Sequence, residues 1–184
     1  MPSFLFLKKI KSTSFLLGFA LVFCFSVAQS QVVINEYSVS NLSSFTDNYQ
    51  KYEDWFELRN LSATPVSLEG YFLSDNPSKP TKFAIPAGVS ISAGGYLKVW
   101  ASGRNEWSSG HLHTSFKLSQ TKDELEFIVL TSPDGELLQQ VELQKTMKGH
   151  SRGKSPFGSD NWAIYTSPTP GATNSGNSFS DYAP

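Results

Sequence analysis

The stretch from Lys82 to Gly103 (KFAIPAGVSISAGGYLKVWASG) constrains the fold of this chain more than any other. It contains two short apolar segments, which Gly94 and Gly95 separate. One face of the second segment carries apolar side chains, namely Leu97, Val99 and Ala101. The other face carries larger ones, namely Tyr96, Lys98 and Trp100. This period of two is typical of a half-buried strand and places Leu97 and Val99 in the core.

Segments of similar composition recur along the chain, each followed by turn residues. Strands are expected at Gln31–Val39, Tyr52–Asn60, Val66–Ser74, Asp123–Thr131, Glu136–Leu143 and Trp162–Tyr165. A short extended piece is expected at His111–Leu118, a polar loop at Arg104–Gly110 and a short edge strand within Lys148–Asn161. Pro133-Asp134-Gly135 is typical of a hairpin turn. Because no segment has a helical period, the pattern predicts an all-β sandwich or barrel.

The alternation of side chains also predicts which of them face the core. They are Val32, Ile34 and Glu36 in the first strand, Phe56 and Leu58 in the second, Leu125, Phe127 and Val129 before the hairpin, and Leu137, Val141 and Leu143 after it. Trp55 is expected on the opposite face of the second strand. A carboxylate, Glu36, is thus predicted to lie beside core residues.

The N-terminus has the three parts of an export signal. Three lysines precede Phe15–Val27, an apolar run shorter than the about 20 residues that a spanning helix needs. Small residues at Ala28 and Ser30 predict cleavage before Gln31. We expect a signal peptide over 1–30, one domain over 31–174, and a linker or disordered tail over 175–184. The expected location is secreted, cell-surface or periplasmic, with no membrane insertion after the signal is removed.

Composition bears on the partners of the mature chain. Its one cysteine, Cys24, lies in the signal, so no disulfide is expected. Loss of the three signal lysines leaves 12 basic against 16 acidic side chains, a net charge of −4. With no basic patch in the sequence, this balance argues against a nucleic acid partner. The tail ends in turn-rich sequence at Pro184, and either further domains beyond it or a loose tail would fit.

Several short motifs occur in an order that resembles a known family. They are Ile34-Asn35-Glu36, Asp54-Trp55-Phe56-Glu57-Leu58-Arg59-Asn60, Leu68-x-Gly70-Tyr71-x-Leu73-Ser74-Asp75, Phe83-x-x-Pro86, Ile91-x-Ala93-Gly94, Val99-x-Ala101-x-Gly103, Phe116-Lys117-Leu118-Ser119, Pro133-Asp134-Gly135, Ser151-x-Gly153 and Thr169-Pro170-Gly171-Ala172-x-Asn174. From about Val32 to Asn174 the chain resembles the lamin tail domain, in particular its bacterial secreted members. The resemblance implies an immunoglobulin-like β-sandwich.

The resemblance brings an interaction surface and no catalytic residues. It implies an exported, non-catalytic module for interaction, adhesion or scaffolding, whose partners are proteins or glycans at the cell envelope. Two alternatives stay open. The chain would be the N-terminal accessory module of a larger secreted enzyme, such as a CotH-type (spore-coat-like) kinase, or a calcium-dependent carbohydrate-binding module. Among the residues themselves, no nucleophile, base and orienting group stand out together, so no catalytic residue is expected.

Metal binding has two sets of candidate ligands. Four carboxylates are candidates for Ca²⁺, namely Asp47, Asp54, Glu57 and Glu36. Calcium takes six to eight oxygen ligands, and the spacing here matches no defined calcium loop. The alternative is a solvated loop, with carboxylates held by Arg59 or by backbone amides. His111 and His113 have a spacing found in zinc sites, without an evident third ligand. We therefore assign no metal site and no cofactor.

Large aromatic side chains are the remaining candidates for a binding surface. The chain has many for its size, among them Trp55, Tyr71, Tyr96, Trp100, Trp107 and Trp162. Aromatic rings stack on sugars and dominate protein interfaces, and they fill cores equally well. Trp55, Trp100 and Trp107 are the predicted binding-surface residues. The alternative is that they fill the rim of the sandwich or lie under the long loops.

Overall fold

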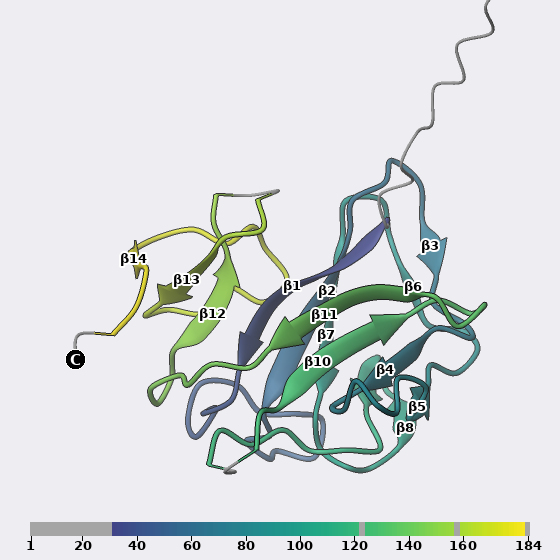
Figure 1. The fold of residues 1–184 in the computed structure, drawn as a ribbon, viewed down its shortest axis with the longest axis horizontal. Coiled ribbons are helices and arrows are strands. Elements are labelled where there is room, and N and C mark those ends of the chain that lie inside the picture. The colour runs from purple at the N-terminus through teal and green to yellow at the C-terminus, as the bar shows by residue number, and fades with distance from the viewer. Residues whose placement is uncertain (1–30, 122–123, 157–158, 183–184) are drawn as a thin grey trace, which may run out of the picture.

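A computed structural model of the 184-residue chain describes residues 31–121, 124–156 and 159–182. The predicted signal peptide and Asp123 lie outside the described residues. Within these ranges every regular element is a β-strand (Figure 1). The described part of the chain therefore contains no helix long and apolar enough to cross a membrane.

The strands are short and follow one another closely along the chain. Their bounds are β1 (Val32–Ser38), β2 (Trp55–Asn60), β3 (Val66–Ser67), β4 (Phe72–Ser74), β5 (Phe83–Ala84), β6 (Ser90–Ile91), β7 (Tyr96–Trp100), β8 (Glu106–Ser108), β9 (His111–His113), β10 (Phe127–Thr131), β11 (Leu137–Glu142), β12 (Ser151–Lys154), β13 (Trp162–Tyr165) and β14 (Ser178–Phe179).

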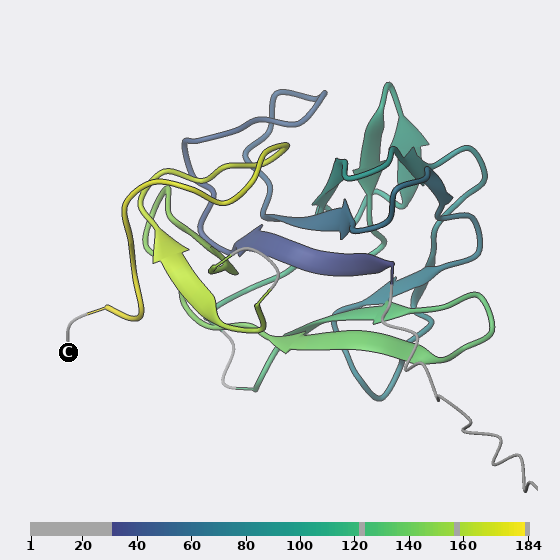
Figure 2. The ribbon, with the colours of Figure 1, turned by 90° about the horizontal axis from the view of Figure 1, so that it is seen from above.

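Two main sheets form a sandwich. One has eight strands in the order β14-β13-β12-β1-β2-β7-β9-β8, and the other has four in the order β11-β10-β4-β5. A two-stranded sheet pairs β3 with β6. Figure 2 shows the green strands β10 and β11 lying as a second layer against the layer that contains β1, in purple. The apolar core lies between the layers, so the predicted immunoglobulin-like β-sandwich is confirmed.

Strands β2 and β7 form the centre of the large sheet, as the alternation predicts. Phe56 pairs with Val99, and Leu58 pairs with Leu97. Phe56, Leu58 and Val99 are fully buried, and Leu97 is half-buried against the same core. Burying each such side chain contributes about 1.5–3 kcal/mol. The period of two therefore identified the core face of both strands correctly.

A β-bulge in β1 overturns one predicted face. Ile34 pairs with Leu58, but the next pair is Glu36 with Glu57, so Asn35 is the extra residue. A bulge shifts the side-chain alternation by one position. Consequently Ile34 and then Tyr37 join the core cluster. Residues directly opposite each other point to the same side of the sheet. Glu57 points away from the core, because its neighbours Phe56 and Leu58 face it. Glu36 therefore also points away from the core, and the prediction that it shares the core face is wrong.

The β10–β11 hairpin is confirmed, but its inward face was predicted wrongly. Ser132 donates to the Glu136 carbonyl at 2.8 Å around the predicted turn. Ile128 and Leu130 face the core, whereas Leu125 is 68% and Leu137 54% exposed. The segment Phe-Ile-Val-Leu is apolar at both parities, so the alternation could not choose between its faces. Of the residues predicted to face inward after the turn, Val141 is in the core and Leu143 packs against it.

Two other segments are divided differently from the prediction. Val66–Ser74 is not one strand but two, β3 and β4, which belong to different sheets. The turn between them contains Gly70, where φ is 80°. A positive φ of this size suits glycine. The expected polar loop of residues 104–110 instead contains β8, with Trp107 at its centre.

The C-terminal part continues the large sheet. β12 is not an edge strand, because it pairs with β1 on one side and β13 on the other. Residues 175–184 were expected to be linker or disordered. The structure differs there, because β14 pairs with β13 and Arg152 binds the Asp181 carboxylate at 3.0 Å.

Candidate functional site

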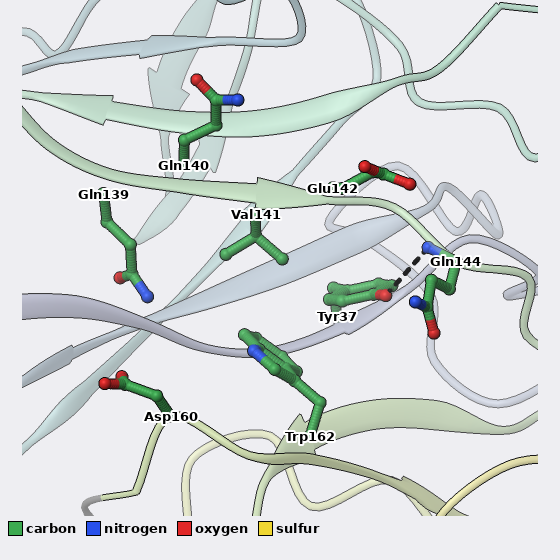
Figure 3. A pocket seen from close by; sticks show the side chains of 8 residues that line it. All are labelled: Tyr37, Gln139, Gln140, Val141, Glu142, Gln144, Asp160 and Trp162. Carbon is green, nitrogen blue, oxygen red and sulfur yellow. Dashed lines mark hydrogen bonds between the residues drawn. The ribbon is translucent and has the colours of Figure 1, made fainter.

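A groove opens where the two sheets separate, between β11 and β13, with β1 behind it (Figure 3). Its volume is about 360 Å³. Eight side chains line it, namely Tyr37, Gln139, Gln140, Val141, Glu142, Gln144, Asp160 and Trp162. Three strands that are distant in sequence therefore combine in one concave surface.

An aromatic pair forms one side of the groove. The rings of Tyr37 and Trp162 lie 5.3 Å apart, tilted by 50°, beneath Val141 (Figure 3). The bulge in β1 turns Tyr37 toward the core side, where its hydroxyl accepts a hydrogen bond from the Gln144 backbone N–H at 3.0 Å. Burial raises the pKa of the Tyr37 phenol above its usual value, so the ring stays neutral. Tyr37 is thus fixed, and the half-buried Trp162 is the ring that meets solvent.

Polar side chains with unused hydrogen-bonding groups form the rest of the groove. Gln139 accepts from the Ile34 backbone N–H at 2.7 Å, which leaves its amide NH₂ as a donor. Within the described residues, the side chains of Gln140, Glu142 and Gln144 form no hydrogen bond with the protein. All three are exposed. Gln144 lies beside Tyr37, whereas Gln140 and Glu142 point to the face of β11 away from Val141 and Trp162 (Figure 3). In the groove, the Gln139 NH₂ and the Gln144 amide are therefore available to a ligand.

The charge of the groove is acidic or neutral. No lysine or arginine is among its lining residues. Asp160 accepts from the Lys154 ammonium at 3.1 Å, and Lys154 is itself almost buried, so this carboxylate is balanced within the protein. Glu142 has no such partner among the described residues. The groove therefore offers little to an anionic ligand.

A pair of buried carboxylates lies on the outer face of the large sheet. Glu36 accepts hydrogen bonds from the Ser151 hydroxyl at 2.5 Å and the Thr169 backbone N–H at 2.9 Å. Glu57 accepts from the Asn35 side chain at 2.9 Å and from the Gly171 backbone N–H. These bonds hold the loop of residues 166–174 against β1 and β2.

Burial dominates the titration of this pair. Desolvation raises the pKa of Glu57 to about 7, although the hydrogen bonds from Gly171 and Asn35 act in the opposite direction. Desolvation likewise raises the pKa of Glu36, against the bonds from Ser151 and Thr169. Both carboxylates accept hydrogen bonds from backbone and side-chain donors of the protein, and both are fully buried.

One protein-family model matches the chain. The model of the Lamin Tail Domain matches residues 26–145, more than half of the chain. The chain belongs to the lamin tail domain family. No curated protein matches it. The lamin tail domain is a non-catalytic, immunoglobulin-like type of domain, in agreement with the sandwich described above.

The groove lies across the end of the lamin tail domain match. The matched residues include β1 and β11, whereas β13, with Trp162, follows residue 145. The β12–β14 segment nevertheless belongs to the same eight-stranded sheet. The groove thus combines residues inside and outside the matched part.

The four candidate calcium ligands have separate hydrogen-bonding roles in this lamin tail domain protein. Asp47 accepts from the backbone N–H groups of Tyr49 at 2.8 Å and Lys51 at 2.9 Å and closes their turn. Asp54 accepts from the Asn41 backbone N–H at 3.1 Å, and burial raises its pKa to about 6. Glu36 and Glu57 bind the 166–174 loop. Among the described residues, no three His, Cys, Asp or Glu side chains are grouped so that they could hold a metal.

The two histidines are part of a network that joins two loops. His113 contacts the Ser102 hydroxyl at 2.9 Å and the Asn48 side-chain oxygen at 2.8 Å. Trp100 donates from its indole N–H to His111 at 2.9 Å. Burial lowers the pKa of His113, which favours the neutral ring. This network ties the 41–54 loop to β9, and its serine and histidine are both buried.

Two of the three predicted surface tryptophans offer no surface. Trp55 and Trp100 are 0% exposed. The 41–54 loop folds over this face of the sheet, with Phe45 edge-on to Trp55 at 6.1 Å. The Lys98 ammonium lies 4.5 Å from the Trp100 ring. An alternating pattern shows which face a side chain takes but not what covers that face.

The third predicted surface tryptophan, Trp107, is half-buried. It lines a separate shallow pocket of about 500 Å³ with Phe83 and Pro86.

Of the groove residues, only Trp162 was a candidate for a binding surface in the sequence, as one of many aromatics. Tyr37 was missed because the bulge that redirects it is set by pairing with β2, which no local pattern reveals.

Proposed function

We propose that this lamin tail domain protein is an exported, non-catalytic binding module, and that the groove between β11 and β13 is its ligand-binding surface. The observation that carries the proposal is a half-exposed indole, Trp162, held against a buried tyrosine beside two glutamines. Gln139 keeps an unused NH₂, and the Gln144 side chain has no partner among the described residues. Binding sites typically combine an apolar platform with a few polar groups that orient the ligand.

The use of the titratable groups supports a role without catalysis. Glu36 and Glu57 are occupied by donors from the protein and covered by the 166–174 loop. The contact between Ser102 and His113 is buried. Acid–base and nucleophilic catalysis need such groups within reach of a substrate.

The N-terminal sequence supports export to the cell envelope or beyond. The lysine-rich start, the short apolar run and the small residues before Gln31 match the pattern that signal peptidase cleaves. At that location, proteins and glycans of the envelope are the available partners. The binding module would thus connect this chain to one of them.

The proposal is tested with the full chain expressed in a bacterial host and recovered after export, its N-terminus expected at Gln31. Binding to isolated cell envelopes, and to their protein and polysaccharide fractions, is measured for wild type and for Trp162→Ala. We expect the variant to bind at least tenfold more weakly, because it removes the exposed part of the aromatic pair.

Trp107→Ala is the matched control, because Trp107 is also half-buried and packs against the core but lies outside the groove. It should bind within twofold of wild type. Thermal unfolding establishes that each variant is folded. Equal binding by wild type and Trp162→Ala would overturn the proposal, as would recovery of the protein with residues 1–30 still attached.

A further inference from the structure

We infer that the groove between β11 and β13 binds an uncharged polysaccharide, with Trp162 stacking on a pyranose ring and the glutamines around it binding the ring hydroxyls. This inference rests on the proposed function and names the ligand class of the same site. A pyranose has an apolar face of C–H groups and a rim of hydroxyls. The groove has a matching division between an aromatic pair and a polar rim (Figure 3).

The aromatic pair is built to hold one ring in a fixed position. Tyr37 is anchored through its hydroxyl to the Gln144 backbone and sits 5.3 Å from Trp162 at a tilt of 50°. The indole is therefore supported on one side and half-exposed on the other. Because these rings are already fixed, the protein loses little side-chain entropy when a ligand binds.

The polar rim suits hydroxyl groups. A side-chain amide offers two donors and an acceptor, and a hydroxyl is both donor and acceptor, so each pairs fully with the other. Gln144 has its whole amide group unused within the described residues, and Gln139 retains its NH₂ donors.

The charge of the site selects among glycans. Anionic sugars and phosphates need arginine, lysine or a cluster of backbone N–H groups. None of the lining residues is basic. Two cations lie close to lining residues, Lys154 at Asp160 and Arg152 near Tyr37, and they are paired with Asp160 and Asp181. An uncharged sugar therefore fits better than a uronic acid or a phosphorylated glycan.

A peptide is the competing ligand. β11 ends the four-stranded sheet, and an extended peptide could add to its open edge through main-chain hydrogen bonds. Such a peptide would depend little on the glutamine side chains. The observations favour a sugar because the unused groups are side-chain amides beside an aromatic ring. The groove volume of about 360 Å³ also suits a short segment of a polysaccharide and not a folded protein.

The experiment uses the exported full chain and measures its affinity by calorimetry and affinity electrophoresis. The probes are neutral polysaccharides (dextran, mannan, xylan and a mixed-linkage β-glucan), anionic ones (alginate and polygalacturonate) and a library of extended peptides. We expect binding to at least one neutral polysaccharide and to neither anionic one.

Two sets of variants test the groove separately. Trp162→Ala should weaken binding at least tenfold, and Trp162→Phe should recover part of the loss. Gln144→Ala should weaken it about fivefold, since the hydrogen bonds of its amide are lost and the exposed side chain leaves the fold unchanged. Gln140→Ala, on the opposite face of β11, should change affinity less than twofold (Figure 3). The controls Trp107→Ala and Asn177→Ala, whose side chains lie outside the groove, should change affinity less than twofold.

The outcomes separate the two proposals. If no neutral polysaccharide binds, or if Gln144→Ala binds as wild type does, the inference is overturned. If in that case a peptide binds and Trp162→Ala abolishes it, the binding module stands with a different ligand. If neither the peptides nor any polysaccharide depends on Trp162, the proposed function fails as well.

Discussion

At the scale of single residues, Glu57 has the most informative titration. Its pKa rises from 4.5 to about 7 on folding, chiefly through desolvation. Between these values the unfolded chain releases a proton that the folded chain keeps, so rising pH favours unfolding. Stability should be highest near pH 4.5 and fall toward pH 7, by about 3 kcal/mol from this group. Glu57→Gln should reduce the fall by about that amount in urea unfolding measured from pH 4.5 to 8.

Two comparisons make this residue-scale prediction specific. Glu36 and Asp54 also have raised pKa values, so some decrease with pH should persist in Glu57→Gln. Glu69→Gln, a change at an exposed carboxylate, should leave the wild-type profile unaltered. Parallel profiles for wild type and Glu57→Gln would show that Glu57 releases its proton as readily in the folded chain as in the unfolded one.

At the scale of elements, the 166–174 loop is held by its last residue as well as by the carboxylates. The Asn174 amide donates to the carbonyls of Asn35 at 3.2 Å and Lys154 at 3.1 Å, and its oxygen accepts from the Asn35 side chain at 3.0 Å. Asn174→Ala removes all three of these hydrogen bonds. We expect a loss of about 2–3 kcal/mol in the free energy of unfolding, measured by urea titration. Asn177→Ala should stay within about 0.5 kcal/mol of wild type, and an equal value for both variants would contradict the role of Asn174.

The elements also show what a sequence can predict. β2 and β7 were predictable because each alternates one apolar face with one polar or aromatic face. β10 was not, because Ile128 and Val129 are both apolar. Only the register with β4, which sets Leu130 opposite the core residue Leu73, selects the inward face. The groove was unpredictable for a related reason. Tyr37 reaches it through a bulge defined by the pairing of β1 with β2, and Trp162 reaches it through the pairing of β12 with β1.

At the scale of the whole molecule, the sandwich is larger than the part that the family model matches. The match ends at residue 145, but β12 pairs with β1, and β13 buries Ile164 and Tyr165. Burial of each of these side chains contributes about 1.5–3 kcal/mol. Removal of the residues after 145 would lose this contribution and would also expose the carboxylates Glu36 and Glu57. The summed loss of stability is comparable with the 5–15 kcal/mol by which a domain is stable.

A chain that ends at residue 145 should therefore lack a cooperative thermal transition, or lose at least about half of its free energy of unfolding. A chain that ends at residue 174 keeps β12, β13 and the 166–174 loop. It should unfold cooperatively and lose only about 1 kcal/mol, because β14 contains two residues and the Arg152–Asp181 ion pair is exposed at Asp181. Calorimetry and circular dichroism of both forms check this. If the shorter form were as stable as the full chain, β12–β14 would be an addition to a complete sandwich, and the groove would be an interface between two separate parts.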